Sequence, residues 1–256
     1  MHTSLRGGRT IAAHGQPWQS SGFLTFSANR ASHPGLDPRL KPGHAGPVET
    51  AAELAERFDR RAPDYDGSTM HRGLAQAVAD FVRLGGVRDI LDVGTGTGLV
   101  LRSLPAGPWK LTGVDLSPGM VQVARAALPS ARFEVADATS LDLPDSSVDL
   151  VTCVTMVHLV PDAAAAMREW RRLLRPGGCL VLATFADDSP SSHGPASQAG
   201  HSRADAHAAF GSSEALERLA AASGLVVDRV AEWEHRSADG APEYRRLITE
   251  FVSDGR

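Results

Sequence analysis

Three closely spaced glycines mark the segment with the clearest chemical potential. Residues 90–99 read ILDVGTGTGL, so that Gly94, Gly96 and Gly98 directly follow an apolar run. Glycine permits positive φ and lets a ligand lie against bare backbone where a strand turns into a helix. Such a turn also suits the phosphate of a nucleotide or a dinucleotide. The spacing argues against a dinucleotide, whose fingerprint is G-x-G-x-x-G and not the G-x-G-x-G present here.

Three aspartates follow successive apolar runs and could bind the parts of a nucleoside. Asp92 precedes the glycines, where a carboxylate would repel a pyrophosphate but could orient a cationic amine. Asp115 could accept hydrogen bonds from both ribose hydroxyls. Asp137 could read an adenine amino group, with apolar contacts to the ring from Leu116 and Met120. One such acid is more often a solvated strand end, whereas three at successive strand ends predict a binding site.

A histidine after the fourth apolar run is the candidate general base. His158 lies in TMVHLVPD, and the intrinsic pKa of histidine suits proton transfer near neutral pH. The alternative, which we favour, is a histidine that packs on the ligand or caps the next helix. Thr155 is expected to line the pocket. His193, His201 and His207 fall in a polar insert, where a surface position is the simpler expectation and their spacing does not require a metal.

The elements that must position these residues alternate between strands and helices. Apolar runs predict strands at 89–93, 111–115, 132–135, 148–155 and 179–185. Helical patterns cover 49–58, a second helix with Leu74 and Phe81 on one face, 120–128, 162–174 and 213–222. Repeated strand–helix–strand units predict an α/β fold with a doubly wound, mainly parallel sheet. The last two strands, 225–234 and 244–253, are expected to form an antiparallel hairpin.

Composition predicts one folded domain, residues 49–256, after a flexible N-terminal extension, residues 1–48, that is rich in Gly, Pro, Ser and His. The extension carries five basic residues and one acid, and the remainder 21 basic and 29 acidic residues. An acidic domain is poorly suited to nucleic acid.

Two further features predict where the protein works. The longest nearly apolar stretch, 148–160, is too short and too polar to span a membrane. Cys153 and Cys179 lie in predicted strands, where buried thiols are expected rather than a disulfide. We therefore expect a soluble, cytoplasmic protein.

Four segments in order resemble one family. ILDVGTGTGL, VDLSPGMVQVAR, VADATSLDLPDSSVDLV and LRPGGCLVLATF are similar to the signature segments of class I, Rossmann-like methyltransferases that depend on S-adenosylmethionine. Among these methyltransferases, the chain resembles the small-molecule type of the ubiquinone and menaquinone biosynthesis group. It implies a seven-stranded sheet that ends in an antiparallel hairpin, with S-adenosyl-L-methionine as the cofactor.

The resemblance also assigns roles to residues. It places Asp115 at the ribose, Asp137 and the Ala138 backbone at the adenine, and Tyr65 over the cofactor within the lid-like run FDRRAPDYD. The methionine part would be surrounded by Asp92, Gly94, Thr95, Gly96, Thr97 and Gly98.

We therefore expect methyl transfer to an O, N or C atom of a small molecule, which requires no metal. Acceptor specificity is expected in the 186–209 insert and before Tyr65. The segment after the fourth strand lacks the Asp/Asn-Pro-Pro-Tyr signature linked to amide nitrogen acceptors. Two alternatives stay open: a protein that binds S-adenosylmethionine without methylating, and, less favoured, an NAD(P)-dependent oxidoreductase. The sequence fits a monomer or a homodimer equally.

Overall fold

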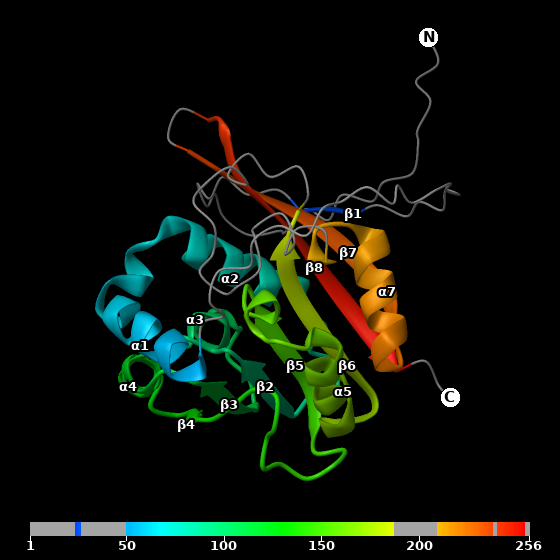
Figure 1. Ribbon diagram of the computed structural model, residues 1–256, viewed down its shortest axis with the longest axis horizontal. Coiled ribbons are helices and arrows are strands. Elements are labelled where there is room, and N and C mark those ends of the chain that lie inside the picture. The colour runs from blue at the N-terminus through cyan, green and yellow to red at the C-terminus, as the bar shows by residue number, and fades with distance from the viewer. Residues whose placement is uncertain (1–23, 27–49, 187–208, 238–239, 254–256) are drawn as a thin grey trace.

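The computed structural model describes residues 24–26, 50–186, 209–237 and 240–253. One mixed sheet runs through these residues in the order β1-β7-β8-β6-β5-β2-β3-β4 (Figure 1). The strands are β1 (Leu24–Phe26), β2 (Asp89–Val93), β3 (Lys110–Asp115), β4 (Arg132–Val135), β5 (Val148–Val154), β6 (Leu174–Phe185), β7 (Leu225–Arg236) and β8 (Pro242–Ser253).

Strand direction follows the expected pattern. The strands β2 to β6 pair in parallel, whereas β8 pairs antiparallel with both β6 and β7. The predicted seven-stranded α/β sheet with its antiparallel hairpin is confirmed. Three residues of the N-terminal extension add an eighth strand, β1, antiparallel to β7. The strand β6 begins at Leu174 rather than at Cys179, because Leu174 already pairs with Val148 before an irregularity in the register.

Local sequence signals set the helix boundaries. The helices are α1 (Ala51–Arg61), α2 (Thr69–Phe81), α3 (Leu99–Ser103), α4 (Pro118–Ala127), α5 (Ala163–Leu173) and α7 (Ser213–Ser223), with short 3-10 turns η1 (Ala62–Gly67) and η2 (Val157–Leu159). A capping box of Thr50 and Glu53 starts α1. Ser117 caps α4 and Asp162 caps α5. Ser212 caps α7, and Gly224 ends that helix at φ 70°.

Helices cover both faces of the sheet. Side chains alternate along a strand, so neighbouring residues pack on opposite faces of the sheet. Leu91, Val151 and Leu180 pack against α5 and α7, whereas Ile90 and Leu150 pack against α2, α3 and α4. Figure 1 shows α5 and α7 together on one side and α1 to α4 on the other. The site-bearing strand ends are thereby held between two packed layers.

Two more expectations can be compared with the structure. Cys153 is a buried free thiol on β5, and Cys179, on β6, is free and half-buried. Within the described part of the chain, no helix is both long and apolar enough to cross a membrane. The insert histidines His193, His201 and His207 lie outside the described residues.

Candidate functional site

A cavity of about 210 Å³ lies at the carboxyl ends of β2, β3, β4 and β5. Ligands of doubly wound sheets bind at this edge. The walls are mainly apolar and come from both the strand ends and the N-terminal helical segment. Among the residues that line the cavity are Leu54, Phe58, Tyr65, Gly94, Gly96, Asp115, Leu116, Met120, Asp137, Ala138, Thr155 and Val160.

The glycine turn requires glycine at all three predicted positions. Gly94, Gly96 and Gly98 have φ values of 67°, 55° and 77°, in the region that other residues rarely adopt. A Cβ on Gly96 would point between Tyr65 and Met120, about 4 Å from each, so the turn presents bare backbone to the cavity. Gly98 is the N-cap of α3 and does not line the cavity.

Asp115 is tied to the glycine turn. Its Oδ2 accepts a hydrogen bond from the Gly96 backbone N–H at 2.8 Å, and its Oδ1 accepts one from the Ser117 N–H at 2.9 Å. Burial raises the pKa of this carboxyl, and the backbone donors oppose the rise. Asp115 therefore both lines the cavity and fixes the loop beside it.

Asp92 lies behind the turn and does not line the cavity. Its side chain is 1% exposed, and Oδ1 accepts a hydrogen bond from the Thr152 hydroxyl at 2.6 Å. Among the described residues, its buried Oδ2 accepts none. Burial raises the pKa of Asp92 to about 6. A buried carboxylate oxygen of this kind is stabilised by a cationic amine, which fits the role predicted for Asp92.

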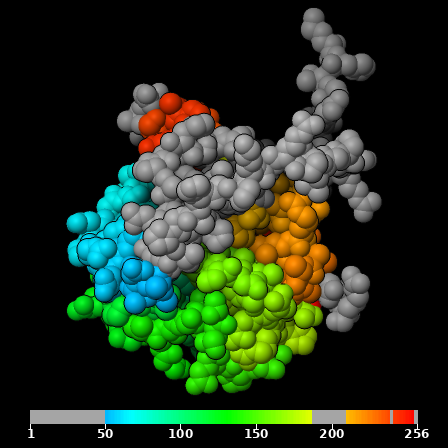
Figure 2. Space-filling view, viewed as in Figure 1, coloured from blue at the N-terminus to red at the C-terminus, as the bar shows by residue number. Residues whose placement is uncertain are grey.

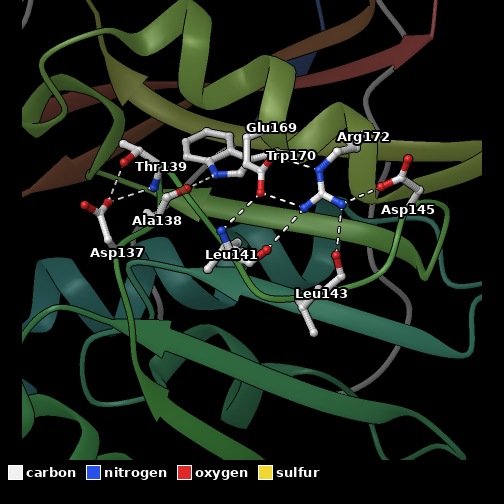
Figure 3. Close-up of polar contacts among 9 residues, drawn as sticks. All are labelled: Asp137, Ala138, Thr139, Leu141, Leu143, Asp145, Glu169, Trp170 and Arg172. Atoms are coloured by element: carbon white, nitrogen blue, oxygen red, sulfur yellow. Dashed lines mark hydrogen bonds and ion pairs between the residues drawn. The ribbon is translucent and has the colours of Figure 1, made fainter.

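Asp137 and Ala138 lie on the loop after β4, which a polar network holds in place (Figure 3). Asp137 Oδ1 accepts hydrogen bonds from the backbone and the hydroxyl of Thr139 at 2.8 and 2.7 Å. The Trp170 indole N–H, on α5, donates to the Ala138 carbonyl at 2.7 Å. Trp170 is fully buried, so the backbone of Ala138 is fixed by a rigid side chain.

Arg172 anchors the rest of this loop, as Figure 3 also shows. It forms an ion pair with Glu169 at 2.7 Å and donates to the Leu143 carbonyl at 2.9 Å. Glu169 in turn accepts a hydrogen bond from the Leu141 N–H at 3.0 Å. The helix α5 thus supports the cavity from outside, through side chains that do not line it.

The lid-like segment, residues 51–67, is fastened by two aspartates. Asp59 accepts hydrogen bonds from the Ser117 hydroxyl at 2.5 Å and the Gly119 N–H at 2.7 Å, at the N-terminus of α4. Asp66 accepts hydrogen bonds from Thr97 and Arg102, on the glycine turn and α3. In Figure 2 the blue and cyan atoms of this segment and α2 lie against the green atoms that follow in the chain.

The part of the cavity wall that follows β5 carries a residue with unfavourable backbone geometry. Thr155 lines the cavity with φ at 52°, which is unfavourable for a β-branched residue, and its N–H donates to the Ala183 carbonyl at 2.9 Å. His158 follows on η2 but does not line the cavity; its ring meets Phe185 edge-on, with 4.7 Å between centroids. The candidate base therefore packs on an aromatic side chain in this structure.

The structure brings most of the predicted site residues together around one cavity. Nine line it: Tyr65, Gly94, Gly96, Asp115, Leu116, Met120, Asp137, Ala138 and Thr155. Asp92, Thr95, Thr97, Gly98 and His158 do not, and Thr97 instead binds Asp66. Sequence reasoning did not single out Asp59 and Asp66 as anchors or Phe58 as a wall; their positions within FDRRAPDYD are the available signal.

Comparison with known proteins finds similarity to methyltransferases. Residues 91–182 match the family model of a methyltransferase domain. The chain is 30% identical over 146 residues to the malonyl-[acyl-carrier protein] O-methyltransferase of Serratia marcescens, covering 57% of each protein. It is 33% identical over 146 residues to the demethylmenaquinone methyltransferase of Chlorobaculum parvum, covering 53% of this chain and 61% of the relative. The matched region therefore spans less than two thirds of these relatives.

A solved structure has the same fold. The cyclase SpnF superposes with a TM-score of 0.60 at 21% identity, over 75% of this chain and 78% of that chain. At that identity the likeness concerns the fold alone.

The sheet order and the acidic strand ends resemble those of class I S-adenosylmethionine-dependent methyltransferases, and residues 91–182 carry the match to a methyltransferase domain. Several of the similar proteins are named as methyltransferases of ubiquinone or menaquinone biosynthesis. Methyltransferases of this kind use S-adenosylmethionine, and the chemistry of the residues present fits that cofactor: a buried carboxylate oxygen could stabilise its amine, Asp115 could bind its ribose, and the apolar cavity beside Asp137 could hold its adenine.

Proposed function

We propose that this protein transfers a methyl group from S-adenosylmethionine to an O, N or C atom of a small molecule. The main support for this proposal is the arrangement of Asp92, Asp115 and Asp137 at adjacent strand ends around the glycine turn. In addition, one buried oxygen of Asp92 accepts no hydrogen bond among the described residues. Three carboxylates in this arrangement could bind the amine, the ribose and the adenine of one ligand. The names of the relatives support small-molecule or carrier-bound acceptors.

The chain's own residues would act mainly by orientation and by exclusion of water. When bound, the cofactor supplies a methyl group activated by a sulfonium. Asp115 and the Gly96 backbone would fix the donor, because they already bind one another. Phe58 and Tyr65 would cover it, and they are held there by Asp59 and Asp66 on the segment that carries them. Alignment and desolvation supply much of the rate enhancement of such displacements.

His158 is our candidate for a general base, although packing on Phe185 equally accounts for its position. An alcohol, phenol or protonated amine as acceptor would need a proton acceptor near neutral pH, whereas a carboxylate would not. For His158→Ala, a fall in kcat with unchanged affinity for S-adenosylmethionine would support the base. An equal loss of both would support the packing role.

The surroundings of the reaction are also part of the proposal. The excess of acidic residues after position 48 argues against nucleic acid as the acceptor. The free thiols of Cys153 and Cys179 support a reducing, cytoplasmic location. Either a monomer or a homodimer is consistent with this function.

The test is a pair of measurements on the purified protein. Calorimetric titration with S-adenosylmethionine should give micromolar binding, and a screen of small phenols, amines and carboxylic acids should then release S-adenosylhomocysteine. Binding without turnover of any acceptor would favour a protein that uses the cofactor without methylating, a possibility that the fold shared with a cyclase keeps open.

A further inference from the structure

One buried serine joins the lid-like segment to the acid that is expected to bind the ribose. Ser117, the N-cap of α4, is fully buried, and its N–H donates to Asp115 Oδ1 at 2.9 Å. Its hydroxyl donates to Asp59 Oδ1 at 2.5 Å, and the hydroxyl oxygen accepts the Met120 N–H at 3.0 Å. The main chain of Ser117 therefore binds one carboxylate, and its side chain binds another.

The second carboxylate, that of Asp59, comes from α1 and is attached closely to the start of α4. Asp59 Oδ1 also accepts the Gly119 N–H at 2.7 Å. The positive end of the helix dipole lies at this N-terminus and favours an anion there. A Cβ on Gly119 would lie only 2.9 Å from Asp59 Oδ1 and 3.2 Å from its Cα, so the approach requires glycine. The lid-like segment thus meets the body of the domain directly beside Ser117.

The two carboxylates that Ser117 binds are near enough for their charges to interact. Burial is the main cause that raises the pKa of Asp115, and the charge of Asp59 raises it further. The N–H groups of Ser117 and Gly96 act in the opposite direction. Attachment of the lid-like segment therefore places a second negative charge beside the acid that is expected to bind the ribose.

This second charge has a different consequence once Asp115 has a ligand. The hydroxyl groups of a ribose would donate to Asp115 and spread part of its charge, which reduces the repulsion on Asp59. Conversely, the charge of Asp59 makes Asp115 a stronger acceptor for such donors. Each event then favours the other, because a coupling free energy between two binding events is reciprocal.

Ser117 also acts through its position. The carboxylate of Asp115 is oriented at two points, since Gly96 binds Oδ2 and Ser117 binds Oδ1. The hydroxyl of Ser117 is in turn held by Asp59. Without Asp59, this hydroxyl keeps its contact with the Met120 N–H but loses its acceptor, so one of the two points that orient Asp115 is held less firmly.

We propose that Ser117 is a positioning residue that couples attachment of the lid-like segment, through Asp59, to binding of the cofactor ribose by Asp115. This inference rests on the proposed function, since it concerns how the same site recognises its cofactor. The lid-like segment is then part of ribose recognition and not only a cover. Loss of Asp59 or of the Ser117 hydroxyl should weaken the recognition of the ribose hydroxyls in particular.

The test compares two nucleosides that differ only in their ribose hydroxyls. Adenosine and 2′,3′-dideoxyadenosine are titrated calorimetrically into the full chain, and the ratio of their dissociation constants measures hydroxyl recognition. We expect wild type to bind adenosine at least about tenfold more tightly. In Ser117→Ala and in Asp59→Ala this preference should fall at least about threefold, because Asp115 is oriented less firmly.

The ratio separates this coupling from a general loss of structure, which would weaken both nucleosides equally and leave the preference unchanged. Ser212→Ala is the matched control: it removes the cap hydroxyl of α7, which accepts the Ala215 N–H at 3.2 Å, and should keep the wild-type preference. The double variant of Ser117 and Asp59 should lose no more preference than Asp59→Ala alone, because both changes act by one route.

Three results would overturn the inference. They are a wild-type protein without preference for adenosine, including one that binds neither nucleoside, a preference that is unchanged in folded Asp59→Ala, and losses that add in the double variant. If Ser117→Ala does not fold, Asp59→Ala still decides, because Asp59 is only half-buried.

Failure of this inference can be distinguished from failure of the proposed function. A separate portion of each sample is titrated with S-adenosylmethionine. Binding of S-adenosylmethionine without the expected nucleoside preferences overturns only the coupling through Ser117. A preference for adenosine that depends on Ser117 and Asp59, in a protein that does not bind S-adenosylmethionine, would support the coupling and contradict the proposed function.

Discussion

At the scale of single residues, Asp115 combines two tasks that are usually separate. It faces the cavity as a hydrogen-bond acceptor and also receives the N–H groups of Gly96 and Ser117. The carboxylate therefore sets the shape of the turn against which the cofactor is proposed to lie. Loss of this side chain should affect cofactor binding more than its contact with a ribose alone would suggest.

We predict that Asp115→Ala weakens binding of S-adenosylmethionine by about 1–3 kcal/mol, the usual cost of losing hydrogen bonds to a buried or charged group. Calorimetric titration measures the change. Glu217→Ala, at an exposed acid on α7, is the control and should leave the affinity unchanged. Unaltered affinity in Asp115→Ala would remove the main support for the ribose role.

Asp92 predicts a pH dependence. Burial raises its pKa from 3.8 to about 6, so the carboxyl is neutral below that pH and ionised above it. Only the ionised form attracts a cationic amine, so affinity for S-adenosylmethionine should rise as the pH increases through about 6. Asp92→Asn should flatten this rise in a pH series of titrations. The same slope in wild type and Asp92→Asn would show that another group is responsible.

The shift of Asp92 also affects stability. Because the folded pKa lies above the ordinary value, the folded state binds the proton more tightly than the unfolded state. The unliganded protein should therefore lose stability as the pH rises from 3.8 through about 6. Thermal unfolding of wild type and Asp92→Asn across this range measures the contribution. A loss of the same size in both proteins would contradict the assignment.

At the scale of elements, α5 is the support of the adenine-side loop. Trp170→Phe removes the hydrogen bond to the Ala138 carbonyl while keeping most of the buried ring. We predict weaker binding of S-adenosylmethionine by about 1 kcal/mol, since the loop that carries Asp137 loses a fixed point. Trp109→Phe is the matched control, because its indole N–H also donates to a carbonyl, that of Pro105. Equal effects of the two variants would refute a specific role for Trp170.

The lid-like segment should close less completely when its anchors are removed. We predict that Asp59→Ala and Asp66→Ala each increase the dissociation rate of S-adenosylmethionine several-fold, because each removes two hydrogen bonds to the body of the domain. Stopped-flow displacement measures this rate. Asp64→Ala, at an exposed acid within the same segment, should have no effect. Unchanged dissociation rates in both anchor variants would mean that the segment is held by packing alone.

Elements were predictable to the extent that local signals define them. The three strands that carry the acids follow from apolar runs, and β2 and β4 have the predicted limits. The early start of β6 was not predictable, because Arg175, Pro176 and two glycines conceal a strand that is set by pairing with β5. The strand β1 likewise depends on pairing with β7 rather than on its own three residues.

At the scale of the whole molecule, the site combines residues that the sequence keeps far apart. The cofactor end was predictable because its acids and glycines occur at regular strand ends in one half of the chain. The anchoring of the lid-like segment was not, because Asp59 and Asp66 belong to no binding motif and reach α4, the glycine turn and α3 only in the folded chain. Sequence reasoning thus found the residues expected to bind the donor but not those that fasten the lid-like segment beside them.

The central claim is that the carboxyl edge of this sheet binds S-adenosylmethionine. The most direct measurement is calorimetric titration of the purified protein with S-adenosylmethionine and, separately, with NADH. We predict micromolar binding of S-adenosylmethionine and no response to NADH. Binding of NADH in its place, or a folded protein that does not bind S-adenosylmethionine, would contradict the account.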